Sequence, residues 1–280
     1  MKLSYILTTT LIFLSAGVNR AFSSAFFEAG AGSSWESNVN RASGSEKQSA
    51  VSLSANAYIG YDKELSPTQN LELGGGYEGL SYLDYQDLSY NGITIWSGYT
   101  KYFNSEDFVR FSPRVTRRFY GDNLRDSTSI NLPLSFELRL KENLSTYFGY
   151  SHIIRRSDDD QFDTDTDQWF LGLEQRLGQK FRLGLDYSFL YGQEYFYREV
   201  LTTSNNLAVG GKKRGSRIST FGVNQEVYSD LVQTQIGTAT LSYDLSRANM
   251  LQLRGSLMST KSSDAFFENQ IIELNYSFLK

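Results

Sequence analysis

Residues 108–140 contain two long segments that alternate strictly between apolar and polar side chains, and this alternation limits the chain to a strand-based fold. In the first segment Val109, Phe111 and Val115 have one parity, whereas Arg110 and Arg114 have the other. Successive side chains of a β-strand point to opposite faces, so a period of two is typical of a strand with one apolar face. The second segment repeats the pattern, with isoleucine, leucine or phenylalanine at every even position. The pair therefore predicts two neighbouring strands.

The length of these segments separates a membrane protein from a soluble one. Strands in soluble proteins usually have about five or six residues. A strand that crosses a bilayer at a tilt needs about 9 to 11 residues, apolar toward lipid and polar toward the lumen of a barrel. The aromatic content of 15% fits the aromatic girdles that such barrels place at both membrane interfaces. The alternation therefore predicts a transmembrane β-barrel in preference to a soluble β-sandwich.

Residues 1–25 have the pattern of a secretory signal peptide. Lys2 precedes an apolar run, and small residues end at Ala25, after which we expect cleavage. An amino-terminal membrane anchor is the alternative, but the run is short and three threonines interrupt it. We therefore predict an exported protein, with a signal peptide at residues 1–25 and an outer-membrane β-barrel at residues 26–280.

The cysteine and charge content excludes several classes of function. The chain has no cysteine, which removes disulfides, thiolate catalysis, cysteine-ligated zinc and a lipoprotein anchor. The formal charge of -4 argues against nucleic acid as a partner, because only the strand face with Arg110, Arg114 and Arg118 is mainly basic. We expect no cofactor.

About twelve alternating segments follow one another from residue 26 onward. We predict strands at residues 27–37, 51–61, 71–83, 93–103, 108–119, 130–140, 144–154, 169–177, 181–197, 227–245, 251–260 and 267–278. The tenth segment loses its alternation near residues 233–237, which allows a bulge or a shorter strand there.

The connections between these segments alternate between short and long. Tight turns occur at residues 104–107, 141–143, 178–180 and 246–249, and longer connections occur at residues 38–50, 121–128, 157–167, 198–226 and 261–265. Bacterial outer-membrane barrels have an even number of strands, short periplasmic turns and longer extracellular loops. The chain is therefore predicted to form an all-β, antiparallel, up-and-down barrel of about twelve strands with both termini in the periplasm.

Residues 26–280 resemble the outer-membrane β-barrel superfamily of Gram-negative bacteria. The most specific part is Tyr276-Ser277-Phe278, which is similar to the aromatic-x-aromatic ending by which the barrel-assembly machinery recognises its clients. Glu273 stands where a glycine is usual. The resemblance implies a location in the outer membrane, surroundings of membrane lipid and lipopolysaccharide, and the assembly machinery as a partner during biogenesis.

If the apolar parity faces lipid, the polar parity lines the lumen with charged side chains. The candidate lumen and selectivity residues are Arg110, Arg114, Arg118, Glu72, Glu78, Glu137, Arg139, Glu174 and Arg176. An acidic wall beside a basic ladder creates a field that orients polar solutes and sets ion selectivity. The first hypothesis is a porin-like channel for passive diffusion of small polar or charged solutes. The alternative is a lumen filled by ion pairs, in a closed barrel that anchors surface-binding extracellular loops.

A third hypothesis is an outer-membrane lipid hydrolase, since some twelve-stranded outer-membrane barrels are phospholipases or lipid A deacylases. Such an enzyme needs a nucleophile and a histidine base within hydrogen-bond reach. His152 is the only histidine, and its parity with Phe148 and Tyr150 directs it toward lipid. Ser151 has the opposite parity, and no serine has the spacing of the outer-membrane phospholipase A motif. We therefore expect no enzymatic activity and interpret His152 as an interfacial polar residue.

Two predicted outer loops carry concentrated charge. The first contains Asp158, Asp159, Asp160, Asp163, Asp165 and Asp167. Carboxylates bind divalent cations, but Gln168 stands where a helix-loop-helix calcium loop has glycine, so we favour a solvated acidic loop. A looser divalent-cation site that bridges lipopolysaccharide phosphates is the alternative. The second loop, residues 198–226, carries clustered Lys and Arg that either constrict the lumen or contact anionic lipopolysaccharide.

Overall fold

The computed structural model describes residues 24–41, 47–199, 217–218, 220, 225–263 and 266–280. The predicted signal peptide lies outside the described residues except for Ser24 and Ala25, which begin the first strand, so its cleavage site stays a prediction. Lys212, Lys213 and Arg214, the basic cluster of the predicted loop at residues 198–226, also lie outside the described residues.

A single antiparallel sheet forms the molecule. Its strands are β1 (Ser24–Glu36), β2 (Ala50–Ser66), β3 (Gln69–Tyr82), β4 (Tyr90–Tyr102), β5 (Phe108–Phe111), β6 (Arg114–Tyr120), β7 (Ser127–Lys141), β8 (Leu144–Ser157), β9 (Thr164–Leu177), β10 (Phe181–Glu199), β11 (Arg217–Ile218), β12 (Gln225–Asp244), β13 (Asn249–Lys261) and β14 (Phe266–Leu279). Short 3-10 helices lie in three connections: η2 (Gln86–Leu88), η3 (Asn123–Arg125) and η4 (Asp160–Phe162).

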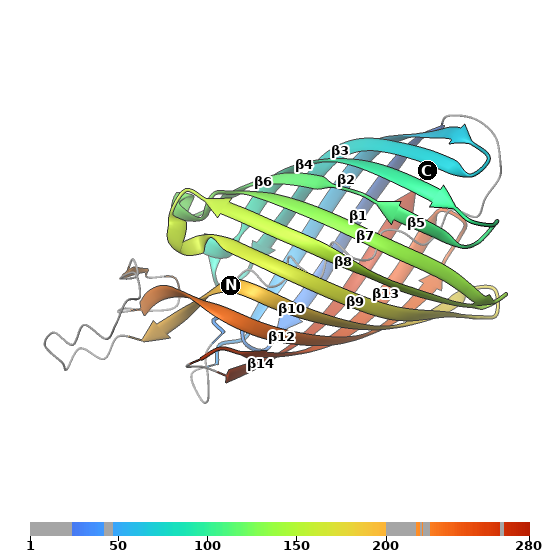
Figure 1. Ribbon diagram of the computed structural model, residues 1–280. Coiled ribbons are helices and arrows are strands. Elements are labelled where there is room, and N and C mark those ends of the chain that lie inside the picture. The colour runs from blue at the N-terminus through green and yellow to red at the C-terminus, as the bar shows by residue number, and fades with distance from the viewer. Residues whose placement is uncertain (1–23, 42–46, 200–216, 219, 221–224, 264–265) are drawn as a thin grey trace, which may run out of the picture.

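Pairing between the first and last strands closes the sheet into a barrel (Figure 1). β5 and β6 are two halves of one wall strand, separated by Ser112 and Pro113, and both pair with β4 and β7. β11 has two residues and pairs with β12 beyond the wall. Within the described residues the wall therefore has twelve antiparallel strands, which confirms the predicted fold class. Closure matters in lipid because it leaves no sheet edge with unpaired backbone groups.

The burial of alternate residues confirms which parity faces outward. Phe111 and Leu134 are 43% and 39% exposed, whereas Thr116 and Ser129 on the same strands of the wall are buried. A barrel in lipid requires this arrangement, since its outer surface is covered by acyl chains instead of water. No helix among the described residues is long and apolar enough to cross a membrane.

The bulge that the sequence allowed near residues 233–237 is absent, because β12 keeps one register with β10 and with β13 throughout that stretch. The apolar alternation fails there for a chemical reason: Ile236 faces the lumen, and Gln235 and Gly237 face outward. Within the described residues, register shifts occur instead between Glu64 and Ser66 and between Arg139 and Lys141, near turns at the opposite end of the barrel.

The short turn between β4 and β5 shows how polar side chains fix a periplasmic connection. Asn104 accepts hydrogen bonds from the backbone N–H groups of Glu106 and Asp107. Asp107 accepts from the backbone N–H of Arg139 at 2.7 Å and from the side-chain amide of Asn104 at 2.6 Å. These bonds lower the pKa of Asp107 below its usual range, because both stabilise the carboxylate form. The turn thereby ties β5 to β7 at the periplasmic rim.

The assignment of inward and outward faces predicts the labelling of single cysteines in a chain that has none. We expect Leu134→Cys to react with a maleimide confined to the bilayer and Arg114→Cys to react only with a water-soluble reagent. The wild type is the control for background labelling. Reaction of position 114, and not position 134, with the bilayer-confined reagent would show that the assigned faces are reversed.

Candidate functional site in the barrel lumen

Two arginines of the β5–β6 strand form ion pairs that reach across β4. Arg110 Nη2 lies 2.7 Å from Glu72 Oε2, and Arg118 Nε lies 2.7 Å from Glu78 Oε1. Both glutamates belong to β3, which has β4 between it and β5–β6. All four side chains are largely shielded from solvent, with 7–17% of each exposed. Charges at such sites need close partners, since an isolated buried charge is strongly unfavourable.

Glycines on β4 make room for both ion pairs. A Cβ atom at Gly92 would lie 3.0 Å from Glu78 Cγ and 3.3 Å from Arg118 Cγ. A Cβ atom at Gly98 would lie 3.2 Å from Arg110 Nη2. Each Arg–Glu ion pair therefore lies against the backbone of β4, the strand between β3 and β5–β6. The sequence analysis identified the four charged residues but not the glycines that allow them to meet.

Arg114 lies between the two ion pairs and has a different neighbour. At its level β4 carries Trp96 and β3 carries Gly74, so this row of β3 offers no carboxylate. The Arg114 guanidinium carbon lies 5.7 Å from the centre of the Trp96 ring, whose Nε1–H donates to Glu72. Among the described residues Arg114 forms no salt bridge. Because guanidinium remains protonated at physiological pH, Arg114 presents a positioned cation without a contacting carboxylate.

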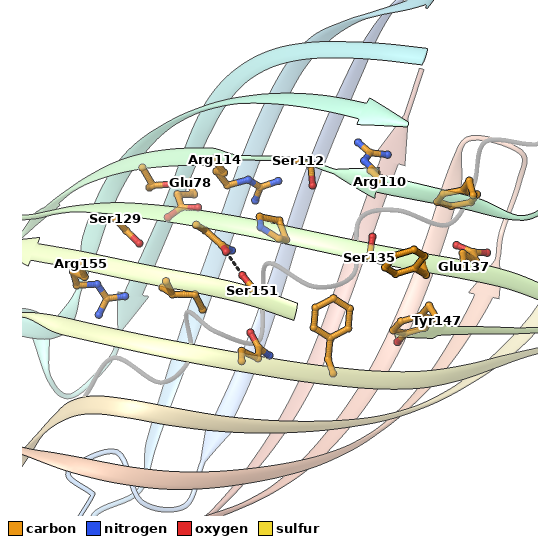
Figure 2. A pocket seen from close by; sticks show the side chains of 18 of the residues that line it. Glu78, Arg110, Ser112, Arg114, Ser129, Ser135, Glu137, Tyr147, Ser151 and Arg155 are labelled. Carbon is orange, nitrogen blue, oxygen red and sulfur yellow. Dashed lines mark hydrogen bonds between the residues drawn. The ribbon is translucent and has the colours of Figure 1, made fainter. Parts of the chain in front are cut away.

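The three arginines line one side of a lumenal cavity with about 1250 Å³ of empty volume that is open to solvent. Figure 2 shows Arg110 and Arg114 on one part of its wall and Tyr147 on another. The rest of the lining comes from β7, β8 and β9, where the apolar side chains of Pro133, Tyr147, Ile153 and Phe170 lie among polar ones and beside the buried Arg155. The cavity therefore combines cationic, polar and aromatic side chains.

A second cavity, with about 1280 Å³ of empty volume open to solvent, lies along β1, β10 and β12 to β14. Arg254 Nη1 lies 3.5 Å from Glu273 Oε2, and Arg182 Nη2 lies 2.6 Å from Asp244 Oδ1. Glu273 is the residue that departs from the usual glycine of the terminal strand, and its lumenal ion pair gives that departure a structural reason. Two ion pairs of this wall thus join neighbouring strands.

The remaining predicted lumen residues divide into two groups. Glu137 lines the first cavity and Glu174 the second. Arg139 and Arg176 are exposed at the periplasmic rim, outside the linings of both cavities. Arg139 donates to the backbone carbonyl of Glu142 at 2.7 Å. The rim position follows from distance along the strand, which alternation alone does not reveal.

A buried cluster lies at the extracellular end of the barrel. We name this the mouth cluster, and its apolar members are Val39, Ala50, Tyr82, Leu88, Phe162, Tyr195, Tyr197 and Val227. They come from the β1–β2, β3–β4 and β8–β9 connections and from the ends of β2, β3, β10 and β12, so strands from opposite parts of the wall meet here. Apolar residues such as Val39 and Phe162 inside polar loop sequences were the available signal, and the sequence analysis did not use it.

Two buried arginines brace the mouth cluster. Arg41 Nη1 donates to Glu194 Oε2 at 3.1 Å and to the carbonyl of Tyr195 at 2.9 Å. Its guanidinium carbon also lies 5.0 Å from the centre of the Tyr195 ring. Arg125 stacks in the same way on Phe162, at 5.2 Å. Charge-assisted hydrogen bonds of this kind hold the loops more specifically than apolar packing alone.

Gly192 lets the β10–β12 hairpin pass the end of β9. Pairing of β10 with β9 stops at Gln193 and Asp165, whereas pairing with β12 continues to Glu199 and Gln225. A Cβ atom at Gly192 would lie 2.2 Å from the carbonyl oxygen of Asp165. Only glycine fits there, and the hairpin beyond it supplies Tyr195 and Tyr197 to the mouth cluster.

His152 contacts carboxylates on the outer face of β8 and β9. Its Nδ1 lies 2.9 Å from Asp167 Oδ1, and its Nε2 lies 3.6 Å from Asp165 Oδ1. Ser151 is on the lumenal side, where it bonds to Asn131. No serine or threonine hydroxyl in the described part of the chain is hydrogen-bonded to His152. The His152 ring is thus held by two carboxylates of β9.

The acidic residues of the β8–β9 connection have local partners. Asp158 lies 3.3 Å from Arg117, and Asp163 accepts the backbone N–H of Ser157 at 2.7 Å. Asp159 accepts the backbone N–H of Gln161 at the start of η4, in the loop that also contains Asp160. Over the described ranges no group of three or more His, Cys, Asp or Glu side chains is arranged to hold a metal ion. A divalent-cation site in this loop stays a prediction.

Comparison with known proteins supports the architecture. No protein-family model and no curated protein sequence matches the chain. An outer membrane channel from Pseudomonas putida F1 superposes with a TM-score of 0.63 and covers 94% of this chain and 97% of its own, at 12% identity. The chain therefore has the closed-barrel fold of an outer-membrane protein. At this identity the likeness shows the fold alone, so the function of the barrel is argued from its lumen.

Two other solved barrels are similar at lower scores. The CymD monoaromatic hydrocarbon channel has a TM-score of 0.47 at 10% identity and covers 90% of this chain and 88% of its own. The β domain of the Bordetella autotransporter BrkA has a TM-score of 0.48 at 10% identity and covers 91% of this chain and 98% of its own.

The close contacts of the β4 glycines predict that valine lowers the stability of the barrel at these positions but not at a glycine that faces open space. Gly92→Val is expected to push Glu78 away from Arg118 and to destabilise the barrel by about 1–3 kcal/mol, the usual range for overpacking. Gly255→Val is the matched control, because its added side chain meets open space on the outer face. Unfolding in detergent, followed by circular dichroism, measures both. Equal stability of the two variants would remove the packing role assigned to Gly92.

Proposed function

We propose that this outer-membrane barrel is a channel for passive diffusion of small polar or charged solutes, with a preference for anions. The observation that carries the proposal is Arg114, a lumenal cation that Trp96 positions and that no described carboxylate contacts. The proposal assigns no catalytic residue.

The arrangement of charge along the β5–β6 strand supports anion preference. Residues four apart on a strand are about 13 Å apart along the backbone, so the backbone of Arg114 lies one such interval from Arg110 and one from Arg118, which form the two ion pairs. Those pairs are nearly neutral at a distance, whereas Arg114 contributes a full positive charge in a narrow space with low-dielectric walls. Such walls focus the field of a charge into the aqueous path and raise the local concentration of the opposite ion. A solute with a carboxylate therefore meets its strongest attraction near Arg114.

The mouth cluster adds a condition for transport. A solute that enters from outside meets buried side chains before it reaches the first cavity, so conduction requires the loops to move. Arg41 holds the first extracellular connection to β10 through its ion pair with Glu194. We infer that the described conformation is the closed state of the channel.

The same cluster favours a second candidate function, a permanently closed barrel that anchors its extracellular loops for surface binding. Loops that pack into one buried unit present a defined outer surface, which a binding protein needs. The two candidates differ in whether the mouth cluster ever opens.

Conductance in planar bilayers tests the anion preference. We expect the purified wild type to pass current with anions favoured, and Arg114→Ala to shift the preference toward cations because the main uncompensated lumenal charge is lost. Arg117→Ala is the matched control, because Arg117 pairs with Asp158. Unchanged selectivity in Arg114→Ala would place the selective region elsewhere.

Loosening the mouth cluster tests whether it is a gate. Arg41→Ala removes the ion pair with Glu194 and the hydrogen bond to Tyr195, so we expect several-fold more frequent channel openings without a change of ion preference. Single-channel recording measures both quantities. Silence of the wild type and of Arg41→Ala, in protein shown to be folded, would favour the closed anchor.

A further inference from the structure

We propose that the second lumenal cavity binds the primary ammonium group of a small organic amine, above the backbone of Gly184. This inference goes beyond the proposed channel function and does not depend on it, because the residues concerned line a different cavity from Arg114. Three oxygen-bearing side chains of the lining carry it: Glu174 on β9, Asp186 on β10 and Thr240 on β12.

The strand register brings these three side chains together around one glycine. Gly184 pairs with Glu174 on one side and with Thr240 on the other. Asp186 is the next residue of β10 on the same face of the wall. Directly paired residues have Cβ atoms about 4.5–5.5 Å apart, and diagonal neighbours are about 7–8 Å apart. Each of the three groups is therefore an immediate neighbour of Gly184, and one small cation above this glycine can reach them all.

Gly184 leaves space between these groups. A Cβ atom at this position would lie 3.6 Å from Thr240 Cβ and 4.0 Å from Asp186 Oδ2, both ordinary van der Waals distances. At Gly172, the partner of Asp186 on β9, a Cβ atom would instead lie 2.6 Å from Asp186 Oδ1. The backbone is thus covered at Gly172 and uncovered at Gly184, so a ligand above Gly184 meets the three side chains without displacing another one.

The acceptor atoms around Gly184 lack partners in the described part of the chain. Both carboxylate oxygens of Asp186 and the hydroxyl oxygen of Thr240 are buried without a hydrogen bond. The whole Thr240 residue is only 3% exposed. No described cation forms a salt bridge with Glu174. Because buried polar atoms are normally hydrogen-bonded, this group of acceptors indicates a ligand that donates hydrogen bonds.

The two arginines of the cavity are engaged by other carboxylates. Arg182 Nη2 lies 2.6 Å from Asp244 Oδ1, and Arg254 Nη1 lies 3.5 Å from Glu273 Oε2. The acidic residues of the lining outnumber these arginines and are Glu28, Glu174, Asp186 and Glu273. An excess of negative charge therefore remains in the lining, and it favours a cationic ligand.

A primary ammonium matches these acceptors better than a metal ion does. It has three N–H donors and no acceptor, which corresponds to two carboxylates and one hydroxyl. Hydrogen bonds from a charged donor to a carboxylate are short and strong, so they fix the position of the group as well as attracting it. Calcium takes about six to eight oxygen ligands, and the described ranges contain no group of three or more His, Cys, Asp or Glu side chains arranged to hold a metal ion.

Isothermal titration calorimetry in detergent, in a buffer without amines, tests the inference with propylammonium and tetramethylammonium. Both ions carry one positive charge, but only propylammonium has N–H donors. We expect propylammonium to bind at least about tenfold more tightly, since a charge-assisted hydrogen bond contributes more than the difference that separates tenfold affinities. Equal affinities of the two ions would overturn the proposed recognition and leave only attraction to negative charge.

Gly184→Ala tests the position of the site without a change of charge. The added methyl group fits without a clash, so the barrel should fold, but it occupies the space above the backbone of residue 184. Propylammonium should therefore bind at least about tenfold more weakly, as expected from crowding of a packed site. Gly255→Ala is the matched control, because its Cβ atom meets open space on the outer face. Unchanged affinity in Gly184→Ala would overturn the assigned site.

Asp186→Asn tests the charge, and it should weaken propylammonium at least about tenfold because the charge-assisted hydrogen bond is lost. Asp158→Asn is the control, since it makes the same change of charge at an exposed residue of the β8–β9 connection. If Asp186→Asn does not fold, Glu174→Gln makes the same test from β9. Full affinity in the folded variant would overturn the site.

The site and the channel can fail separately. Propylammonium binding in a folded protein that conducts no ions would overturn the channel and leave the site. Absence of propylammonium binding in a protein whose anion preference depends on Arg114 would overturn the site and leave the channel.

Discussion

A charge inside a membrane barrel is tolerated only where a partner or water reaches it. For Arg110, Arg114 and Arg118, the residues of β4 determine which partner each arginine reaches. Where β4 has Gly92 or Gly98, a glutamate of β3 meets an arginine of β5–β6 across the bare strand. Where β4 has Trp96, the ring occupies that space and Arg114 stacks on it. The residues of β4 therefore decide which of the three cavity-lining arginines form ion pairs with β3 and which one stacks on an aromatic ring.

The two ends of the lumen differ in the kinds of side chain that line them. Toward the periplasm, cavities lie between charged and polar side chains, and ion pairs join neighbouring strands. Toward the outside, aromatic and aliphatic residues from loops pack without solvent around Arg41 and Arg125. A barrel of this strand number lies between those that side chains fill and those that hold an open channel. The chain combines both, one at each end.

The sequence was sufficient for the architecture because lipid imposes a simple pattern on the wall. Alternation at residues 130–140 gave the faces of β7, and the lengths of the connections gave the two ends. Prediction was weaker where a polar side chain faces outward or an apolar one faces inward while the strand register continues unchanged, as at Gln235 and Ile236. The predicted strand at residues 169–177 also began later than β9 does. In the first residues of β9, Thr164 and Thr166 face inward and aspartates face outward, so no alternation of apolar and polar residues marks the strand there.

The functional features needed three-dimensional information for a specific reason. Parity placed Arg110, Arg114 and Arg118 on one face, but their different partners depend on residues of β3 and β4 that lie opposite them only in the folded register. Likewise, the positions of the Tyr147 and Phe170 rings depend on a glycine of the adjacent strand. Sequence reasoning can reach such features only after strand register is known.

The mouth cluster also has a consequence for the order of biogenesis. Arg41 and Glu194 are separated by 153 residues. Arg41 lies on the β1–β2 connection and Glu194 near the end of β10, so the two approach each other only when most of the wall exists. Contacts at such sequence separation form late, because the loss of chain entropy precedes the gain from contact. The pairing of β1 with β14 joins residues still further apart in the sequence, such as Glu36 and Ile271. By the same reasoning, packing of the mouth cluster belongs with closure of the wall among the last events of maturation.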